Sequence, residues 1–352
     1  MNSLPPYKPM RMHILLAQVA CVLLMLVTSL AFMALYVSPQ TTVLFQWIGV
    51  SLPFLLFGNL IFLFIALYRR SWYSICPMIA ILANFHYFSQ MVRQHTGEEV
   101  HMVDIRFATF NVREFKMIYN MSSMEQIAEY LSSNKINTIC LQEVPAECSV
   151  ADLKRVFTSM PYVVITGGRP GQNQLAILSA YPLDHVTTVS FEERPNCSLF
   201  ADMTIKNEKV RIANCHLQTT NWNQVKGTIF QQEHDKGSWI EAFAKMSSNF
   251  RYRSRQVDTI RSIIDRSPHP IIVGGDFNNS PVSYAYNTIK GDLKDAFREV
   301  GNGYGYTYRN LLKLYRIDFV LFSGTKLQVS NYRTGDVDFS DHLPVLVDVT
   351  IN

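Results

Sequence analysis

The sequence predicts an α/β domain that follows a group of membrane-spanning helices, and three observations lead to this fold class. Long apolar runs without acidic residues fill positions 1–95. Beyond residue 104, strand-like runs alternate with stretches of helical periodicity. Polar side chains that serve as ligands or catalysts recur where the strand-like runs end. We therefore expect a membrane anchor at residues 1–95 and a second domain at residues 96–352.

The anchor contains two long apolar segments and a weaker third one. Residues 12–37 and 42–68 both exceed the ~20 residues that cross a bilayer core. They are also longer than the apolar region of about 7 to 15 residues in a cleaved signal peptide, so we predict retained spans. Residues 71–92 are a third candidate, diluted by a proline and several polar side chains. For each segment the alternative is a helix buried in a protein core.

Basic residues in the short flanks predict the orientation of these spans. Lys8 and Arg11 precede the first span, Arg69 and Arg70 follow the second, and the loop between them has no Lys or Arg. The positive-inside rule then puts the N-terminus in the cytoplasm of an inner (cytoplasmic) membrane. If residues 71–92 also span, the anchor is multi-pass and the second domain lies outside the cytoplasm, which is the side we expect. Otherwise that domain is cytosolic.

Charge is distributed unevenly between the two parts. The chain has a net charge of +4, but 27 of its 32 Lys and Arg residues and all 28 acidic residues fall in residues 96–352. That domain is nearly neutral, so it lacks the overall basic character of a typical nucleic-acid-binding domain. Nucleic acid stays a possible partner that net charge does not favour, and the sequence indicates no oligomeric state.

The second domain is expected to consist of strands with a few helices between them. Strand-like runs lie at residues 105–112, 138–144, 162–166, 175–179, 186–191, 198–205, 210–217, 271–273, 314–323, 327–333 and 343–351. Helical periodicity marks residues 121–134, 250–266, 282–290 and 293–300. Residues 219–249 are polar and irregular, and we expect a long loop there.

The stretch PHPIIVGGDFNNSP, which begins at Pro268, is the most informative of these. Its β-branched residues 271–273 predict a buried strand, and the glycine pair after them predicts a sharp turn, since glycine has no Cβ. Asp276 and Asn278 follow. Alternate residues of a strand share a face, so this carboxylate and this amide can reach one point. The alternative is an ordinary loop, because Asp, Asn, Gly and Pro are common turn residues.

Other polar residues near strand ends extend this candidate site. Taken singly, each has a structural explanation, such as strand-end hydrogen bonding for an asparagine or a place in the core for a histidine. Their order in short motifs is more informative: NV, QEV, NCHL, GGDFN, RIDFVL and SDH. These motifs contain Asn111, Glu143, His216, Asp276, Asn278, Asp318, Asp341 and His342.

In these motifs and their order, residues 104–352 resemble the endonuclease/exonuclease/phosphatase superfamily, which includes deoxyribonuclease I, apurinic endonucleases, inositol-polyphosphate phosphatases and neutral sphingomyelinases. The resemblance does not extend to the anchor, so the chain looks like a membrane-anchored bacterial member. It implies a four-layer α/β sandwich, with two mainly antiparallel sheets packed face to face between helices. The site is then expected at one edge of the sheets.

The chemistry of phosphate-ester hydrolysis agrees with this resemblance. The reaction needs a metal that neutralises developing charge, a positioned water and help for the leaving oxygen. Glu143 is the best metal ligand, helped by Asn111 and Asp341. An all-oxygen ligand set without cysteine suits Mg²⁺ or Mn²⁺ rather than zinc.

The remaining residues have catalytic roles in this interpretation. Asp276, held by Asn278, is placed to orient or deprotonate the attacking water. His342 contacts the phosphate, with Asp318 fixing its ring. His216 donates a hydrogen bond or a proton toward the phosphate or the leaving group. Which histidine acts as acid and which as base stays open.

The branch of the superfamily is less defined. His216 in NCHL resembles the deoxyribonuclease, sphingomyelinase and phosphatase branches, since apurinic endonucleases have a tyrosine in a comparable role. The loop GGRPGQNQ, residues 167–174, either adds Arg169 and Asn173 as substrate contacts or is only a hairpin turn.

We therefore predict a membrane-anchored, divalent-metal-dependent phosphoesterase that hydrolyses a phosphodiester or phosphomonoester by in-line attack of water. A phospholipid head group or another small phosphodiester is the expected substrate. One alternative is an anchored endonuclease or exonuclease acting on DNA. Another, from a different class, is a membrane scaffold that keeps the fold without catalysis.

Overall fold

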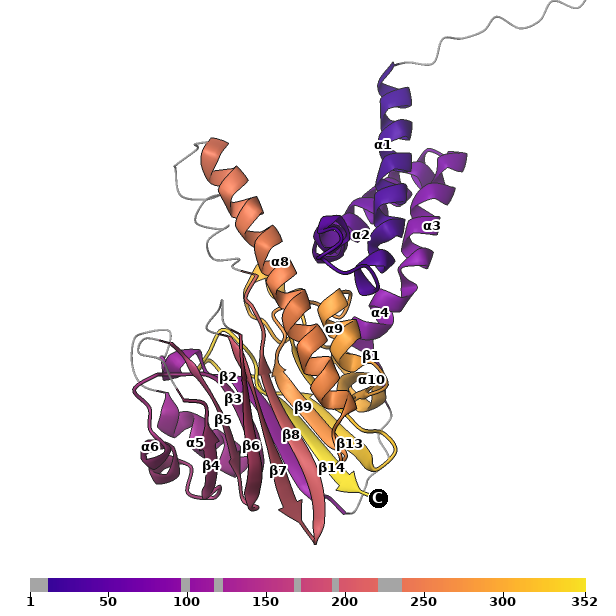
Figure 1. Cartoon of the computed structure of the whole chain (residues 1–352). Coiled ribbons are helices and arrows are strands. Elements are labelled where there is room, and N and C mark those ends of the chain that lie inside the picture. Colours follow the sequence, from indigo (N-terminus) through magenta and orange to yellow (C-terminus); the bar gives the residue numbers. More distant parts are fainter. Residues whose placement is uncertain (1–11, 96–101, 117–122, 168–171, 192–195, 221–235) are drawn as a thin grey trace, which may run out of the picture.

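Figure 1 shows a computed structural model of the chain, in which a domain with two sheets is joined to a group of helices. The structure describes residues 12–95, 102–116, 123–167, 172–191, 196–220 and 236–352. The N-terminal helices extend away from the sheets. The long helix α8 (Lys236–Asp265) lies against one sheet and continues beyond it on the same side as the N-terminal helices.

Two six-stranded sheets form the centre of the C-terminal domain, with the orders β13-β14-β2-β3-β5-β4 and β10-β12-β9-β8-β7-β6. The strands of the first sheet are β2 (Ile105–Asn111), β3 (Thr138–Val144), β4 (Tyr162–Ile165), β5 (Gln174–Ser179), β13 (Leu327–Thr334) and β14 (Val345–Ile351). Those of the second are β6 (Leu183–Ser190), β7 (Cys197–Ile205), β8 (Glu208–His216), β9 (Ile271–Asp276), β10 (Lys294–Asp295) and β12 (Asp318–Phe322).

Both sheets combine one parallel pair at the centre with antiparallel neighbours. The parallel pairs are β2 with β3 and β8 with β9. The other neighbouring strands in the two sheets pair antiparallel. A parallel pair needs a crossover connection, and the crossovers contain the helices α5 (Met124–Ser133) and α8. The prediction of two mainly antiparallel sheets is confirmed.

Apolar side chains hold the four layers together. Phe107 and Leu199 are among the buried residues that fill the space between the two sheets. Helices α5 and α6 (Val150–Val156) cover the outer face of the first sheet, where Leu131 is fully buried. Helices α8 and α9 (Tyr284–Lys290) cover the second sheet in the same way. Figure 1 shows these helices on opposite sides of the sheets, which is the predicted sandwich.

The glycine pair after residue 273 does not form the sharp turn that we predicted. Strand β9 continues through Gly274 and Gly275 to Asp276. A Cβ at Gly274 would lie 2.7 Å from Cζ of Phe107 in the other sheet, and one at Gly275 would overlap the carbonyl oxygen of Cys215. Gly275 also has a positive φ of 154°. The glycines are therefore needed for close packing between and within the sheets.

The boundaries of the predicted helices also change. Residues 219–249 were expected to form a loop, but α8 begins at Lys236 and is thus longer than the predicted helix at 250–266. The prediction was wrong because this part of α8 is polar on much of its surface and weakly periodic. Helix α9 begins at Tyr284 and α10 is Ala296–Val300, so both are shorter than predicted.

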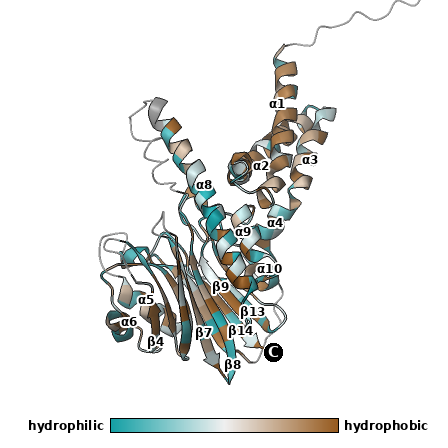
Figure 2. Cartoon of the chain, in the orientation of Figure 1, coloured by the Kyte–Doolittle hydropathy of each residue, from teal (hydrophilic) through white to brown (hydrophobic). Residues whose placement is uncertain are grey.

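Residues 12–91 form the helices α1 (Met12–Ser29), η1 (Leu30–Leu35), α2 (Leu44–Tyr68), η2 (Trp72–Ser74), α3 (Ile75–Ala83) and α4 (Phe85–Met91). Two stretches, residues 12–35 and 44–68, have the length and apolar composition of membrane spans. Only 17% and 28% of their most apolar windows are buried, which is unlike the core helix of a soluble domain. Figure 2 shows the apolar character of these helices along their length.

The third predicted span, residues 71–92, is not one continuous helix. It breaks at Asn84, whose side-chain amide donates to the carbonyl oxygens of Thr28 and Ala80, both at 2.9 Å. Asn59 of α2 donates to the Thr28 hydroxyl, also at 2.9 Å. The apolar helix at residues 72–83 is shorter than the ~20 residues that cross a bilayer.

The chain after this break packs against the C-terminal domain. The side-chain oxygen of Gln90 accepts a hydrogen bond from the Tyr286 hydroxyl, and its carbonyl accepts one from Arg316. Strand β1 (Val92–Arg93) pairs with β11 (Gly303–Tyr304). The N-terminal helices and the C-terminal domain are therefore in contact just before residue 95, and the domain boundary placed there stays a prediction.

Candidate active site

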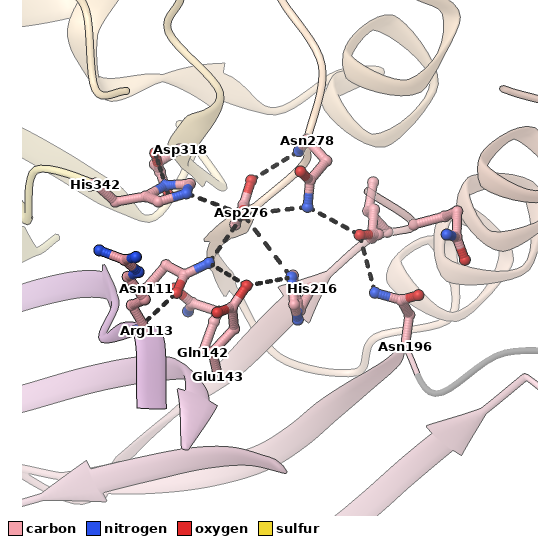
Figure 3. Close-up of polar contacts among 12 residues, drawn as sticks. Asn111, Arg113, Gln142, Glu143, Asn196, His216, Asp276, Asn278, Asp318 and His342 are labelled. Atoms are coloured by element: carbon pink, nitrogen blue, oxygen red, sulfur yellow. Dashed lines mark hydrogen bonds and ion pairs between the residues drawn. The ribbon is translucent and has the colours of Figure 1, made fainter. Parts of the chain in front are cut away.

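Strand register brings the predicted residues from both sheets to one edge. His216 of β8 is paired with Asp276 of β9, and Asp276 is paired with Asp318 of β12. In the other sheet, Asn111 ends β2 beside β3, which carries Glu143 near its own end. Figure 3 shows these side chains directed toward one another.

His342 and Asp318 form a buried pair. Nδ1 of His342 lies 3.0 and 3.1 Å from the two carboxylate oxygens of Asp318. The hydroxyl of Thr307 accepts a hydrogen bond from the backbone N–H of Asp318 at 3.0 Å, which positions the start of β12. Burial acts to lower the pKa of His342, but the charges of Asp318 and Asp276 prevail and raise this pKa to about 10. The ring is therefore protonated at neutral pH.

Asp276 lies at the centre of the site and is almost completely buried. The backbone N–H of Asn278 donates to its Oδ1 at 2.8 Å, and the side-chain amides of Asn278 and Asn111 donate to its Oδ2, both at 3.1 Å. Desolvation raises the pKa of Asp276, while the charge of His342, 3.8 Å away, opposes that rise. Because its pKa is raised, this carboxylate is a stronger base than a free aspartate.

Glu143 and His216 face each other on the other side of Asp276. Oε1 of Glu143 accepts a hydrogen bond from Asn111 at 3.0 Å and lies 3.6 Å from Nε2 of His216. The same nitrogen of His216 is 3.8 Å from Oδ2 of Asp276. Glu143 has a positive φ of 57°, a strained conformation for a residue other than glycine, and such strain concentrates at functional sites.

Glu143, Asp276 and His342 line a pocket of 260 Å³, and His216, Asn111 and Asp318 lie behind that lining. Both charged and apolar residues contribute to the lining. The charged residues of its lining are Arg113, Glu114, Glu143, Asp276, Asp341 and His342. The apolar and aromatic residues are Val50, Tyr308, Leu311, Tyr315 and Ile317. Val50 belongs to helix α2, so the N-terminal helices contribute to the wall of this pocket.

The donor groups of the pocket fit a divalent cation bound by oxygen. Glu143 and Asp341 both line the pocket, and neither carboxylate has a charged Lys or Arg nitrogen within 4.0 Å among the residues that the structure describes. Carboxylate oxygens without nearby thiols are the ligands that Mg²⁺ and Mn²⁺ prefer. Ligand-type atoms of Asp276, Asp318 and His342 also lie within 4.8 Å of one another. We favour the first pair, because His342 and Asp318 already hydrogen-bond each other and the ring is protonated.

Asn111 lies between two carboxylates of the site, and its predicted role as a metal ligand stays a prediction. Its amide nitrogen bridges Glu143 and Asp276, and its Oδ1 accepts a hydrogen bond from the backbone N–H of Arg113 at 3.1 Å. In this arrangement Asn111 holds the two carboxylates together rather than offering its oxygen to the pocket.

Of the two substrate contacts predicted in the loop at residues 167–174, the structure describes one. Arg169 lies outside the described residues. The side-chain amide of Asn173 is 3.3 Å from Oε1 of Glu114, which lines the pocket, so Asn173 is placed behind the pocket wall.

Arg113 is a pocket residue that sequence reasoning missed. Among the lining residues that the structure describes, it carries the one Arg or Lys side chain. It follows Asn111 by two positions and has a positive φ of 46°, within a left-handed turn that includes Glu114. Its proximity to Asn111 was the available signal, but an exposed arginine after a strand is too common to be informative by itself.

A buried amide pair beneath the site was also missed. The side chain of Gln142 donates to Oδ1 of Asn214 at 2.7 Å, and Asn214 donates to the carbonyl oxygens of Leu141 and Ala176. Asn214 thus connects the second sheet to two strands of the first. The signal was present in the sequence, since both are polar residues inside otherwise apolar strands.

Helix α8 supports the loop after β9 through hydrogen bonds that run from Arg253 by way of Thr220. Arg253 is fully buried and donates to the Thr220 hydroxyl at 2.8 Å, and that hydroxyl donates to the carbonyl oxygen of Asn278 at 2.7 Å. This chain of hydrogen bonds holds the residue that in turn fixes Asp276.

Family models match both parts of the chain. One described as the Endonuclease/Exonuclease/phosphatase family matches residues 108–342, and one described as a domain of unknown function matches residues 13–91. A search of curated proteins gave no match.

Solved structures are similar to the C-terminal domain. An endonuclease/exonuclease/phosphatase from Beutenbergia cavernae has 16% identity and a TM-score of 0.52, over 71% of this chain and 72% of that one. The human Nocturnin catalytic domain has 15% identity and a TM-score of 0.52, over 74% and 100%. A humanized D. rerio TDP2 has 17% identity and a TM-score of 0.53, over 70% and 99%. At these identities the similarity shows the fold, and the family model covers most of the sequence. The chain therefore belongs to the endonuclease/exonuclease/phosphatase family.

Proposed function

We propose that this protein is a membrane-anchored, divalent-metal-dependent phosphoesterase that hydrolyses a phosphodiester or a phosphomonoester by in-line attack of water. The observation that carries the proposal is the convergence of Glu143, Asp276 and the protonated His342 on one pocket. Acidic ligands, a base and a cationic hydrogen-bond donor are the groups that phosphoryl transfer to water requires.

Asp276 acts on the water in this mechanism. Its carboxylate, held by Asn278 and Asn111, takes a proton from the water as the water oxygen bonds to phosphorus. The bond from phosphorus to the leaving oxygen breaks at the same time, and that oxygen receives a proton. Glu143 and Asp341 would hold a Mg²⁺ or Mn²⁺ ion, which would supply positive charge to the phosphoryl oxygens.

The two histidines have separate tasks. His342 is kept protonated by Asp318 and donates a hydrogen bond from Nε2 to a phosphoryl oxygen. His216, between Glu143 and Asp276, gives the proton to the leaving oxygen. Arg113 is placed at the pocket to bind a further phosphate oxygen.

The N-terminal helices anchor the domain in a membrane. Their apolar side chains are exposed to an extent that water does not tolerate over so large a surface. Arg69 and Arg70 at the far end of α2, with the basic residues before α1, put that end in the cytoplasm. The catalytic domain then lies on the outer side if η2, α3 and α4 return across the bilayer. Together they cover residues 72–91, which is about the ~20 residues that a crossing needs, although the helix breaks at Asn84.

The lining of the pocket favours a small phosphoester over DNA. Arg113 is its one Lys or Arg among the described lining residues, whereas Val50, Leu311, Tyr315 and Ile317 form an apolar side. A nuclease groove is expected to contact successive phosphates with several basic side chains. We therefore retain a phospholipid head group or a small phosphodiester as the substrate.

Hydrolysis by the full-length protein in detergent tests this proposal. The substrates are bis-p-nitrophenyl phosphate, mixed phospholipid vesicles and plasmid DNA, each with Mg²⁺, with Mn²⁺ and with EDTA. We expect metal-dependent turnover that falls about 100-fold or more in Glu143→Gln and in His342→Ala. Glu125→Gln, on the exposed face of α5, is the matched control and should match the wild type.

Turnover that is independent of metal, or unchanged in Glu143→Gln, would contradict the proposed mechanism. A folded, metal-supplied protein that turns over none of these substrates would instead support the non-catalytic scaffold. Preference for plasmid DNA would support the nuclease alternative.

A further inference from the structure

The anchor forms part of the catalytic pocket. Val50 of α2 lines the pocket, and its carbonyl oxygen accepts a hydrogen bond from the Tyr315 hydroxyl at 2.7 Å. The backbone carbonyl of Tyr315 also accepts a hydrogen bond from the backbone N–H of Thr307, the residue that positions Asp318. One turn before Val50, Trp47 donates to the Ser247 hydroxyl of α8 at 3.0 Å. Helix α2 thus contacts α8 about one turn away from the residue with which it lines the pocket.

The position of Val50 along α2 sets its depth relative to the proposed bilayer. Arg69 and Arg70 mark the cytoplasmic end of α2, and an α-helix crosses the bilayer core in about 20 residues. Counting back from Arg69 brings the opposite surface of the core to Gly49 and Val50. Trp47 then lies at the level of the lipid head groups, where tryptophan is enriched. The pocket wall is therefore at the outer surface of the membrane.

Exposed apolar side chains surround this point. Leu312, next to the pocket residue Leu311, is 79% exposed. On α8, Ile240 is 71% exposed and Phe243 is 51% exposed. The ring of Phe243 contacts Trp47 with 4.8 Å between centroids, so Ile240 lies about one helical turn farther along α8. Figure 1 shows this end of α8 rising on the same side of the sheets as the N-terminal helices while leaning away from them, and Figure 2 shows apolar residues among polar ones on it.

Ile240, Phe243 and Leu312 are not isolated apolar residues on a polar surface. Large exposed apolar residues that continue an apolar surface mark a site of contact with a membrane or a partner. Here that surface continues directly into α2, whose outer side chains we place in lipid. A lipid surface is therefore the occupant that the geometry favours.

We propose that the substrate is a phosphoester of a membrane lipid that enters the pocket directly from the outer leaflet. Ile240, Phe243 and Leu312 insert into the interface and, with Trp47 and Val50, form an apolar collar along which the acyl chains lie. The phosphate then enters between Arg113 and His342 without leaving head-group depth. This inference rests on the proposed function and specifies its substrate class and entry route.

The test compares hydrolysis of phosphoesters in membrane lipids with hydrolysis of a soluble phosphodiester. Full-length protein is reconstituted into vesicles of phosphatidylcholine, phosphatidylethanolamine, phosphatidylglycerol and sphingomyelin, and release of phosphorus-containing products is measured with Mg²⁺. The parallel assay uses bis-p-nitrophenyl phosphate in the same vesicles. Variants are Leu312→Asp and the double variant with Ile240→Asp and Phe243→Asp, and Val186→Asp on β6, 47% exposed, is the matched control.

We expect the ratio of lipid turnover to soluble-ester turnover to fall about 10-fold in each collar variant, since a charged group opposes insertion at the interface. The ratio should stay at the wild-type value in Val186→Asp. Soluble-ester turnover without lipid turnover, or an equal ratio in all variants, would overturn the lipid entry route and leave the proposed function intact. If the wild-type protein turned over neither the lipids nor the soluble ester, this result would count against the proposed function itself. Plasmid DNA cleavage that exceeds lipid turnover would replace lipid by nucleic acid.

Discussion

Two groups of Asp and His residues in this protein have the same composition and different surroundings. We name Asp276, Asp318 and His342 the inner cluster, and Asp184, His185 and Asp202 the outer cluster. In each cluster the ligand-type atoms lie within 4.8 Å of one another. By residue type and spacing alone, either cluster qualifies as a metal or catalytic site.

Neutralising partners separate the two clusters. In the outer cluster, Arg211 donates to both carboxylate oxygens of Asp202, at 2.7 and 3.0 Å, and Lys209 lies 3.0 Å from Asp184. In the inner cluster, no Lys or Arg lies within 4.0 Å of either aspartate among the described residues, and both aspartates are buried. Their charge acts on His342 instead and raises its pKa. The difference teaches that buried carboxylates without a Lys or Arg partner can shift the pKa of a neighbouring histidine, and we therefore expect the inner cluster to be the reactive one.

The largest expected effect is on catalysis by the inner cluster. Asp276→Asn removes the base while keeping the shape and most of the hydrogen bonds, so kcat/KM for bis-p-nitrophenyl phosphate should fall about 10²- to 10⁴-fold. Asp184→Asn in the outer cluster should leave kcat/KM unchanged. Similar losses in both variants would remove the distinction between the clusters.

A smaller effect is expected from Asp318→Asn, which acts through His342. Loss of this partner should lower kcat about 10- to 100-fold. The pH dependence is more diagnostic. His342 must be protonated, so activity persists below its pKa of about 10 and is lost above it. Asp318→Asn lowers this pKa and should move the alkaline limb of the pH–rate profile to lower pH. An unmoved limb would show that Asp318 does not hold the proton on His342.

Metal binding should stabilise the protein through the polar side of the pocket. Saturation with Mg²⁺ at about 100 times its Kd adds about 2.7 kcal/mol of stability, which corresponds to a rise in Tm of about 5–10 °C. Differential scanning fluorimetry with and without EDTA measures this shift. It should be absent in Glu143→Gln and present in His185→Ala. The reverse result would place the metal in the outer cluster.

The smallest effect is expected at the exposed histidine of the outer cluster. His185→Ala should change the free energy of unfolding by less than about 0.5 kcal/mol, because the Asp184 and Asp202 carboxylates keep their pairs with Lys209 and Arg211. Urea titration in detergent measures this difference. A loss of several kcal/mol would show that the outer cluster depends on its histidine.

Most strands could be predicted from the sequence because their signals are local. β2 and β3 were placed to within a residue, since alternation of apolar residues and a terminal polar residue reflect burial on one face. The start of α8 could not be placed in this way, because its first turns are weakly periodic and pack against α2 rather than on the sheets. A contact with a segment about 200 residues away leaves no local pattern.

The candidate site divides in the same manner. Residues such as Glu143, Asp276 and His342 were identifiable because they combine reactive side chains with strand ends. Arg113 and the Thr220 hydroxyl were not identifiable, since their importance arises from neighbours that are distant in sequence. Val50 was least accessible, because an apolar residue inside an apolar helix carries no sign that it faces a polar pocket.

By itself, the sequence determined the family, the sandwich of two mainly antiparallel sheets and the polar residues at its edge, because burial periodicity and motif order are written in short segments. The tertiary structure decided the charge state of His342, the hydrogen bonds between the site residues and the contribution of α2 to the pocket wall. Strand register puts His216, Asp276 and Asp318 side by side, and desolvation there raises the pKa of Asp276. Register, burial and the contact between α2 and α8 are properties of the packed chain, and no short segment contains them.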